Sequence, residues 1–301
     1  MQTYKEKPLI SIIIPTYNRL SLLKDTLNSI ISQITKDPVE VIVVDDGSED
    51  GTWDYLNELN KNFPFLKIFR HNSNKGPGSA RNTGLSLAKG KYVFFFDSDD
   101  LLLKGALEKL LHFAKENKEE IYVFNSFREK KGKNKFILFP LEPSPLKRLK
   151  FLFEGAYSES LFLVKREIAI KHPFPEDLRV REDFYVKAKW LTLYKIKIIN
   201  EPIAFYRDHS LRLRKQSKYY FEGALTSVEK LFKELPSEFQ ALYPYALYLT
   251  YLELAKRAYQ IKDYTLSLNY LREAQKVYPQ SLTKFKFLKL LLKSWCRSKF
   301  L

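Results

Sequence analysis

Three aspartates within four positions are the clearest sign of chemistry in this sequence. Asp97, Asp99 and Asp100 directly follow the apolar run from Tyr92 to Phe96. Such a short, aromatic-rich run is typical of a strand buried on both faces, and acids after it would lie at the rim of a sheet, where open α/β folds bind ligands. Carboxylate oxygens suit Mg²⁺ or Mn²⁺, which bind through one or two carboxylates plus substrate phosphates. The alternative is an acidic turn that caps a helix over residues 104–115.

The elements that would position these aspartates alternate between strand and helix. Buried strands are predicted at residues 9–14, 39–44, 66–69 and 92–96, with amphipathic helices between them. Pro15 is expected to end the first strand, because proline cannot donate to a neighbouring strand, and Ser21 is expected to cap the first helix. Alternation at this spacing predicts βαβ units and a parallel sheet.

Polar residues follow the C-terminal ends of these strands. Thr16 and Tyr17 follow the first strand, Asp45 and Asp46 follow the second, and Arg81 lies beyond a glycine-containing loop after the third. In one doubly wound sheet these ends line a single crevice. The first strand is not followed by Gly-x-Gly-x-x-Gly, and there is no Gly-Lys-Ser/Thr loop, so a dinucleotide-binding fold and a P-loop nucleotidase are both disfavoured.

Charge and cysteine content narrow the range of partners and compartments. The chain has 51 basic and 35 acidic residues, a net charge of +16, which favours anionic partners. Nucleic acid is disfavoured, because the basic residues are dispersed and no recognition motif is present. Cys296 is the only cysteine, which excludes an intrachain disulfide. Residues 1–8 have no apolar core like that of a signal peptide, so we expect a cytoplasmic protein.

Four motifs, taken in order, resemble those of the family 2 glycosyltransferases. They are Pro15 to Arg19, Val43 to Ser48, Gly76 to Gly84, and Asp97 to Asp100. Enzymes of this family have the GT-A fold and transfer sugars from nucleotide-activated donors. The resemblance covers roughly residues 9 to 210. It implies an α/β, Rossmann-like nucleotide-diphospho-sugar transferase fold, with a mixed sheet flanked by helices.

The same resemblance implies where the donor would bind. The implied donor-binding residues are Pro15, Thr16, Tyr17, Asp46, Arg81, Asp97 and Asp99. Thr16, Tyr17 and Asp46 would surround the base, Arg81 would lie near the base or pyrophosphate, and Asp97 would approach the ribose. Several alternatives stay open at this stage. Asp45 could only stabilise the turn after it, Asn18 and Arg19 could shape the loop, and Arg81 could be a surface helix residue.

A divalent cation and a general base complete the implied site. Mn²⁺ or Mg²⁺ would be held by Asp99, with Asp100 and His209 as further ligands. Glu182 and Asp183 open a predicted amphipathic helix and resemble the family's acidic dipeptide, whose aspartate is the general base that accepts the proton of the acceptor hydroxyl. The alternatives are a carboxylate that only stabilises the helix start, and a histidine with a structural role.

The segment between these motifs is less regular. Strands are predicted at residues 120–124, 135–139 and 160–164, and a helix at 146–153 after a proline-containing loop. Family members vary most here, where the acceptor is recognised. Arg212, Arg214 and Lys215 follow the last motif and could pair with donor phosphates or form a solvated basic loop.

From Tyr219 onwards the sequence becomes leucine-rich and aromatic and lacks strand patterns. We therefore predict two domains: a GT-A domain over residues 1–215 and a small all-α region over 216–301. Part of this region, turning at residues 262–264, resembles a single tetratricopeptide-like hairpin, although Ala258 stands where an aromatic is usual and Ser267 where alanine is usual. An ordinary helical hairpin is the alternative.

The last segment, residues 282–301, has six basic residues and no acid, interleaved with leucines and aromatics. This pattern predicts a basic amphipathic helix that binds an anionic membrane surface, peripherally on the inner face. The alternative is a terminal helix that packs its leucines on the other helices.

Together these features predict a metal-dependent, inverting glycosyltransferase of the hexosyltransferase type. Its donor would be a nucleotide-diphospho-sugar, a UDP-sugar, and its acceptor a saccharide or lipid-linked molecule in bacterial surface polysaccharide or lipopolysaccharide synthesis. The alternative is a non-catalytic scaffold with the GT-A fold that binds a partner through its helices. A sugar-phosphate nucleotidyltransferase is disfavoured, because the loop after the first strand lacks its glycine-rich basic pattern.

Overall fold

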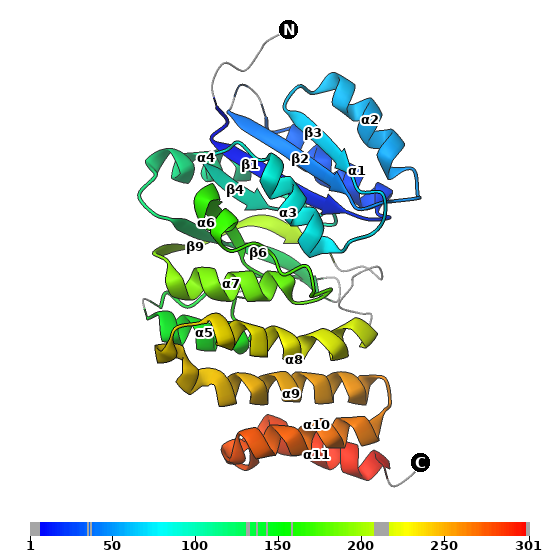
Figure 1. The fold of residues 1–301 in the computed structure, drawn as a ribbon, viewed down its shortest axis with the longest axis vertical. Coiled ribbons are helices and arrows are strands. Elements are labelled where there is room, and N and C mark those ends of the chain that lie inside the picture. The colour runs from blue at the N-terminus through cyan, green and yellow to red at the C-terminus, as the bar shows by residue number, and fades with distance from the viewer. Residues whose placement is uncertain are drawn as a thin grey trace. The chain divides into compact units, whose positions relative to one another are not determined.

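The structure is a computed structural model that describes residues 7–34, 36, 38–130, 133–136, 138–142, 144–157, 159–207 and 217–298. The chain divides into two compact units. Unit 1 contains residues 1–141 and 156–210, and unit 2 contains residues 142–155 and 211–301. Figure 1 shows that unit 1 holds the sheet and that unit 2 is helical.

Unit 1 is built on a nine-stranded sheet with the order β3-β2-β1-β4-β8-β6-β9-β5, and β7 pairs with β6. The strands are β1 (Ile10–Thr16), β2 (Val39–Asp45), β3 (Leu66–Arg70), β4 (Tyr92–Phe95), β5 (Leu101–Leu102), β6 (Ile121–Lys130), β7 (Lys133–Phe136), β8 (Leu161–Lys165) and β9 (Ile196–Tyr206). The first four strands pair in parallel, as predicted, whereas β8 runs antiparallel between β4 and β6. The sheet is therefore mixed.

Helices cover both faces of this sheet (Figure 1). They are α1 (Leu20–Ile31), α2 (Thr52–Asn62), α3 (Pro77–Leu87), α4 (Ala106–Glu116), α6 (Arg166–Lys171) and α7 (Glu182–Leu193). On one face, Ile12 packs in a buried cluster with Leu27 of α1, Leu56 of α2 and Leu110 of α4. Ile13, the next residue in the strand, points to the opposite face and meets α3. This alternation is the period-two pattern of a strand buried on both sides.

Two predictions about the first loop are wrong. Pro15 does not end β1, which continues to Thr16, paired with Asp45. The pairing of β1 with β4 stops at Ile13, so Pro15 lies where the strand has a neighbour on one side only, and a missing N–H is tolerated there. Ser21 does not cap α1.

Asp50, from the loop after β2, takes the role that we assigned to Ser21. Its Oδ2 accepts a hydrogen bond of 2.9 Å from the backbone N–H of Leu20, the first residue of α1. Its Oδ1 accepts one of 3.2 Å from the N–H of Thr52, the first residue of α2. One carboxylate thus satisfies a free donor at the start of each helix.

The second half of the sheet was predicted less well. β7 covers Lys133–Phe136 rather than residues 135–139, and β9 was not predicted at all. β9 carries Lys197, Asn200 and Pro202 and is mostly half-buried, so its sequence lacks the apolar run that marked the central strands. Within the described ranges, no helix combines the length and the apolar character needed to cross a bilayer.

Unit 2 is all helical. Its helices are α5 (Pro145–Phe153), α8 (Ser217–Glu234), η2 (Ser237–Leu242), α9 (Tyr243–Gln260), α10 (Tyr264–Val277), η3 (Pro279–Thr283) and α11 (Phe285–Ser298). α9 and α10 form the predicted hairpin, which turns at Lys262 with φ of 66°. Asp263 caps α10 by accepting the N–H of Leu266 at 2.8 Å.

A third helix completes the core of that hairpin. Phe287 and Leu290 of α11 pack in one buried cluster with Tyr248 of α9 and Leu271 of α10. Ser267, which departs from the tetratricopeptide pattern, is fully buried, and its hydroxyl lies 2.9 Å from that of Ser294 of α11 and donates to the carbonyl of Ala255 at 2.9 Å. The small serine therefore makes room and a polar contact for α11.

Candidate functional site

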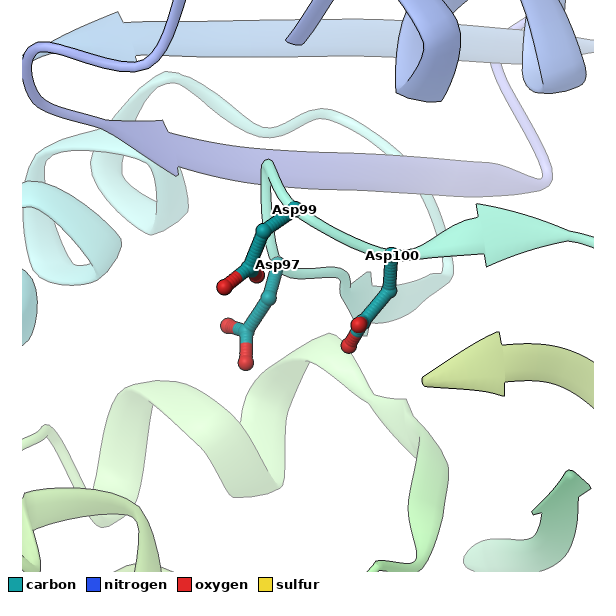
Figure 2. Close-up of side chains that lie close together, drawn as sticks. All are labelled: Asp97, Asp99 and Asp100. Carbon is teal, nitrogen blue, oxygen red and sulfur yellow. The ribbon is translucent and has the colours of Figure 1, made fainter. Parts of the chain in front are cut away.

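The acidic cluster lies in the loop between β4 and β5. Asp97, Asp99 and Asp100 each offer one carboxylate oxygen, and these oxygens lie within 4.8 Å of one another (Figure 2). Asp99 and Asp100 are buried, whereas the Asp97 side chain is 48% exposed. Three hard oxygen donors at this spacing fit a divalent cation with ligand distances of ~2.1 Å after small side-chain rotations.

Two arginines fasten this loop to α1. Arg19 Nη1 lies 3.1 Å from Asp99 Oδ2. Arg207 donates from Nε to the Asp99 carbonyl at 2.5 Å, from its backbone N–H to Asp100 Oδ1 at 3.3 Å, and from Nη1 to Asp25 of α1 at 2.8 Å. The guanidinium of Arg19 therefore contacts the acidic cluster as well as lying in the loop after β1. His209, Arg212, Arg214 and Lys215 lie outside the described residues.

Arg81 of α3 joins two acidic motifs that are far apart in the sequence. Its Nη2 donates to Asp97 Oδ1 at 2.8 Å, and its Nη1 donates to Glu182 Oε1 at 2.7 Å. The Arg81 side chain is almost completely buried, and its guanidinium lies 5.3 Å from the centre of the Phe174 ring. The alternative that Arg81 is a surface helix residue is therefore wrong. Such charge-assisted pairs are among the stronger hydrogen bonds of a folded protein.

Glu182 and Asp183 begin α7 after Arg181, whose backbone is left-handed with φ of 63°. Glu182 is buried against Arg81, whereas Asp183 is partly exposed and its Oδ2 lies 3.3 Å from Lys187 Nζ, one turn along the helix. Burial raises the pKa of Glu182 to about 7, the negative charge of Asp183 adds to this rise, and Arg81 opposes it.

A pocket in unit 1 brings these groups together. Arg81, Asp97, Asp183 and Lys187 all line it, and the aromatic part of its wall comes from Phe95, Phe162, Phe174 and Trp190. The rings of Phe95 and Trp190 stack with centroids 6.1 Å apart. Carboxylates and cations beside an aromatic wall suit a sugar, which has polar hydroxyls and apolar C–H faces. The aromatic wall was not predicted, because its residues come from separate elements and form no motif.

The residues predicted near the base lie at the ends of β1 and β2. Tyr17 is 42% exposed, whereas Thr16 is buried, and its hydroxyl has no hydrogen-bond partner among the described residues. Asp46 is buried and organises the loop before α3: its Oδ2 accepts the N–H of Gly76 at 2.8 Å, and its Oδ1 accepts the N–H of Lys75 at 2.9 Å. The same Oδ1 lies 2.7 Å from Nδ1 of His71.

Asp45 and Asn18 stabilise the loops in which they lie. Asp45 Oδ1 accepts the backbone N–H of Ser48 at 3.0 Å, so Asp45 stabilises the turn after β2. Asn18, with φ of 48°, shapes its loop: its side-chain oxygen accepts the N–H of Glu49 at 2.8 Å, and its own N–H donates to Ser48 at 2.9 Å. Asn18 and Asp45 thus hold the two loops that carry Tyr17 and Asp46.

Comparison with solved structures shows the fold. Over 95% of this chain, the structure is similar to that of S. aureus TarS 1-349 in complex with UDP-GlcNAc, with a TM-score of 0.66, 20% identity and 89% of that chain covered. Over 97% of this chain, it is similar to the mannosyltransferase PcManGT from Pyrobaculum calidifontis in complex with GDP-Man and Mn²⁺, with a TM-score of 0.57, 17% identity and 87% of that chain covered. The predicted GT-A fold is confirmed.

Comparison of sequences shows the family. The chain is 33% identical over 255 residues to the GalNAc(5)-diNAcBac-PP-undecaprenol beta-1,3-glucosyltransferase of Campylobacter jejuni, which covers 83% of this chain and 74% of the relative. It is 38% identical over 127 residues to the poly(ribitol-phosphate) beta-N-acetylglucosaminyltransferase TarP of Staphylococcus aureus, covering 42% of this chain and 38% of the relative. The family model described as glycosyl transferase family 2 matches residues 11–172, more than half of the chain. This protein therefore belongs to glycosyl transferase family 2.

Proposed function

We propose that this protein is a metal-dependent, inverting glycosyltransferase of the hexosyltransferase type. It transfers a sugar from a UDP-sugar to a saccharide or lipid-linked acceptor in the synthesis of a bacterial surface polysaccharide or lipopolysaccharide. One observation carries the proposal: Asp97, from the acidic cluster after β4, and Asp183, at the start of α7, line the same pocket. A group that binds the donor and a group that could accept a proton from the acceptor therefore face the same space.

The names of the relatives support the choice of substrates. The Campylobacter relative is named for an undecaprenol-linked acceptor, and the TarS structure holds UDP-GlcNAc. The exposed ring of Tyr17, directly after β1, would stack on a nucleobase. Asp46 contributes by holding the backbone of Lys75 and Gly76, which precedes α3. The donor phosphates would then lie toward the acidic cluster, with Arg81 near the pyrophosphate and Asp97 near the ribose.

Asp183 is the proposed general base. Its partly exposed carboxylate would accept the proton of the acceptor hydroxyl as that oxygen forms its bond to the anomeric carbon. The bond between the anomeric carbon and the phosphate oxygen breaks, and its electron pair leaves with the nucleoside diphosphate. Such a single displacement inverts the anomeric carbon and needs no covalent intermediate. Lys187 places a positive charge 3.3 Å from Asp183 Oδ2, at the pocket wall.

Asp99 and Asp100 would hold Mn²⁺ or Mg²⁺, with His209 as a further ligand, and Asp97 belongs to the same cluster of carboxylates. When bound, the cation supplies Lewis-acid stabilisation of the charge that develops on the leaving phosphate. Arg19 and Arg207 keep the carboxylates of this loop in place, and Arg81 fixes the direction of Asp97. The enzyme would act in the cytoplasm, where nucleotide-sugars are available, with peripheral contact to an anionic membrane surface.

The test is a screen of the purified protein against nucleotide-sugars with Mn²⁺ and with Mg²⁺, with release of free nucleoside diphosphate as the readout. Asp99→Asn keeps the size of the side chain but removes its charge, so turnover should be lost while the protein stays folded. EDTA should weaken donor binding to the wild type. Full turnover in EDTA, with no residual metal, would contradict the metal dependence. Absence of any donor hydrolysis or transfer would favour the non-catalytic scaffold instead.

A further inference from the structure

Helix α11 has three faces with different chemistry. In a helix of 3.6 residues per turn, positions spaced by three and four lie on one face. One face is buried against the other helices of unit 2 and consists of Phe287, Leu290 and Ser294. This face satisfies the packing requirement of an ordinary terminal helix. The side chains on the other two faces are exposed.

The second face is apolar and exposed. It consists of Phe285, Leu288, Leu292 and Trp295, which are 75%, 37%, 62% and 50% exposed. Single exposed apolar residues are common, but four of them in a row on one helix face, two of them aromatic, form a patch. Leu282, just before the helix, is 46% exposed and extends the set of apolar side chains.

The third face is cationic. It consists of Lys286, Lys289, Lys293 and Arg297, all exposed, and it separates the apolar exposed face from the buried one on one side of the helix. Residues 282–298 contain no acid. A row of cations next to an exposed apolar strip is the arrangement of a helix that lies in a bilayer interface, with apolar side chains below the headgroups and lysines beside anionic lipid phosphates.

Charge complementarity indicates which partner binds the exposed apolar and cationic faces of α11. A second copy of the chain that covered the apolar strip with its own α11 would bring two rows of cations together, which costs free energy. An anionic lipid surface covers the apolar strip and neutralises the cations at once, and tryptophan is favoured at the headgroup level. The same apolar strip without cations would not distinguish these two occupants.

We propose that α11 binds the surface of an anionic lipid bilayer through Phe285, Leu288, Leu292 and Trp295, with Lys286, Lys289, Lys293 and Arg297 contacting lipid phosphates. This inference deepens the proposed function, since it assigns the surface through which the enzyme would reach a bilayer that holds a lipid-linked acceptor. α11 lies on the surface and does not enter the bilayer as a span.

The experiment is vesicle flotation of the full chain with phosphatidylcholine vesicles that contain 30% phosphatidylglycerol or none, a composition chosen at roughly the anionic content that attracts basic segments. The wild type should float with the anionic vesicles, and less so as salt rises. Phe285→Ser with Leu292→Ser should lower the binding at least about tenfold. Lys289→Gln with Lys293→Gln should lower it about 25-fold on anionic vesicles, since each lysine contributes about fivefold.

Matched controls come from exposed residues of unit 2 outside α11. Ile261→Ser and the pair Lys233→Gln with Lys262→Gln should float like the wild type. Removal of the whole helix is a poorer test, because it would expose the core around Leu271. An independent readout is tryptophan fluorescence. Brominated lipids should quench Trp295 in the wild type, and the loss of that quenching in Trp295→Phe distinguishes it from Trp53 and Trp190.

Two outcomes would overturn the inference. One is equal flotation of the wild type and both α11 variants, with no quenching of Trp295. The other is a dimer of the wild type in sedimentation that Phe285→Ser with Leu292→Ser converts to a monomer, which would assign the apolar strip to a second copy. Flotation needs no nucleotide-sugar, so a failed glycosyltransferase assay with normal flotation would contradict only the proposed function.

Discussion

Glu182 and Asp183 are adjacent in the sequence, yet their carboxylates meet different partners. Glu182 is buried against Arg81, which also holds Asp97, so two carboxylates share one guanidinium. Asp183 is directed to the pocket, where Lys187 is its neighbour. A carboxylate that is engaged by a buried arginine is poorly placed to accept a proton from an incoming substrate. The geometry therefore favours Asp183 as the base and Glu182 as the residue that positions Arg81.

Substitution of Asp183 should separate chemistry from binding. Asp183→Asn preserves size but removes basicity, and we expect turnover to fall by roughly two to four powers of ten. Because the base acts only as the acceptor oxygen attacks, it contributes to the transition state more than to donor affinity. Nucleotide-sugar binding, measured by calorimetry, should change little.

The control for this substitution is Glu182→Gln, which should cost less turnover and keep the fold. If Asp183→Asn retained near wild-type turnover while Glu182→Gln abolished it, the roles of the two residues would have to be exchanged. If both variants stayed active, the base would lie elsewhere in the chain.

Glu182 should also affect how the free energy of unfolding depends on pH. Burial raises its pKa from 4.5 in the unfolded chain to about 7 in the folded protein. Between these values the folded state keeps a proton that the unfolded chain has released, so the free energy of unfolding decreases as pH rises through this range. Urea unfolding should show the wild type losing stability relative to Glu182→Gln from about pH 4.5 to about pH 7. A difference between the two proteins that stays constant with pH would contradict the raised pKa.

At the scale of elements, the helix that carries Arg81 lies unusually close to the sheet. A Cβ atom added to Gly84 of α3 would lie 2.4 Å from Cγ2 of Ile13 in β1. Ile13 is buried and β-branched, so its side chain has little freedom to move away. Because Gly84 has no side chain, α3 can approach β1 closely. This approach positions Arg81 of α3 for its hydrogen bond to Asp97.

Gly84→Ala should consequently destabilise unit 1. We expect a loss of roughly 1–3 kcal/mol in the free energy of unfolding, because an extra methyl group in a packed interface forces strain on its neighbours. Chemical unfolding measures it. Ser86→Ala, on the exposed side of the same helix, is the control and should change stability by no more than about 0.5 kcal/mol. An unchanged stability of Gly84→Ala would mean that α3 can move away from the sheet without cost.

The elements that could be predicted from sequence are those whose signals are local. The first four strands were apolar runs, and the acidic loop after β4 was a motif of four residues. β9 could not be recognised, because most of its residues are half-buried or exposed and its pairing partners β6 and β5 lie far away in the sequence. Strands with a local sequence signal could be predicted, whereas a strand that depends on pairing with distant segments could not.

The same limit applies to the candidate site. Asp97, Asp99 and Asp183 were found through motifs, and the structure places Asp97 and Asp183 at one pocket. The contacts of Arg19 and Arg207 with the acidic loop cross between distant elements, so no spacing in the sequence could indicate them. The roles assigned to these residues in binding and catalysis remain predictions.

At the scale of the whole molecule, each unit contains a buried cluster of its own. The cluster around Ile12 belongs to unit 1, and the cluster around Phe287 belongs to unit 2. The residues that line the proposed catalytic pocket all belong to unit 1. A substitution that damages the core of unit 2 should therefore lower the free energy of unfolding of that unit without changing donor affinity.

Phe287→Ala tests this prediction, and Phe285→Ala, in the same helix, is the control. Phe287 is fully buried, whereas Phe285 is 75% exposed. Phe287→Ala should destabilise unit 2 by roughly 3–5 kcal/mol because it leaves a cavity, and Phe285→Ala by no more than about 0.5 kcal/mol. Hydrogen exchange should show faster exchange of the α9 and α10 amides in Phe287→Ala, with β1 and β2 unchanged and UDP-sugar affinity unaltered by calorimetry. A parallel loss of donor affinity would show that the two cores are energetically coupled.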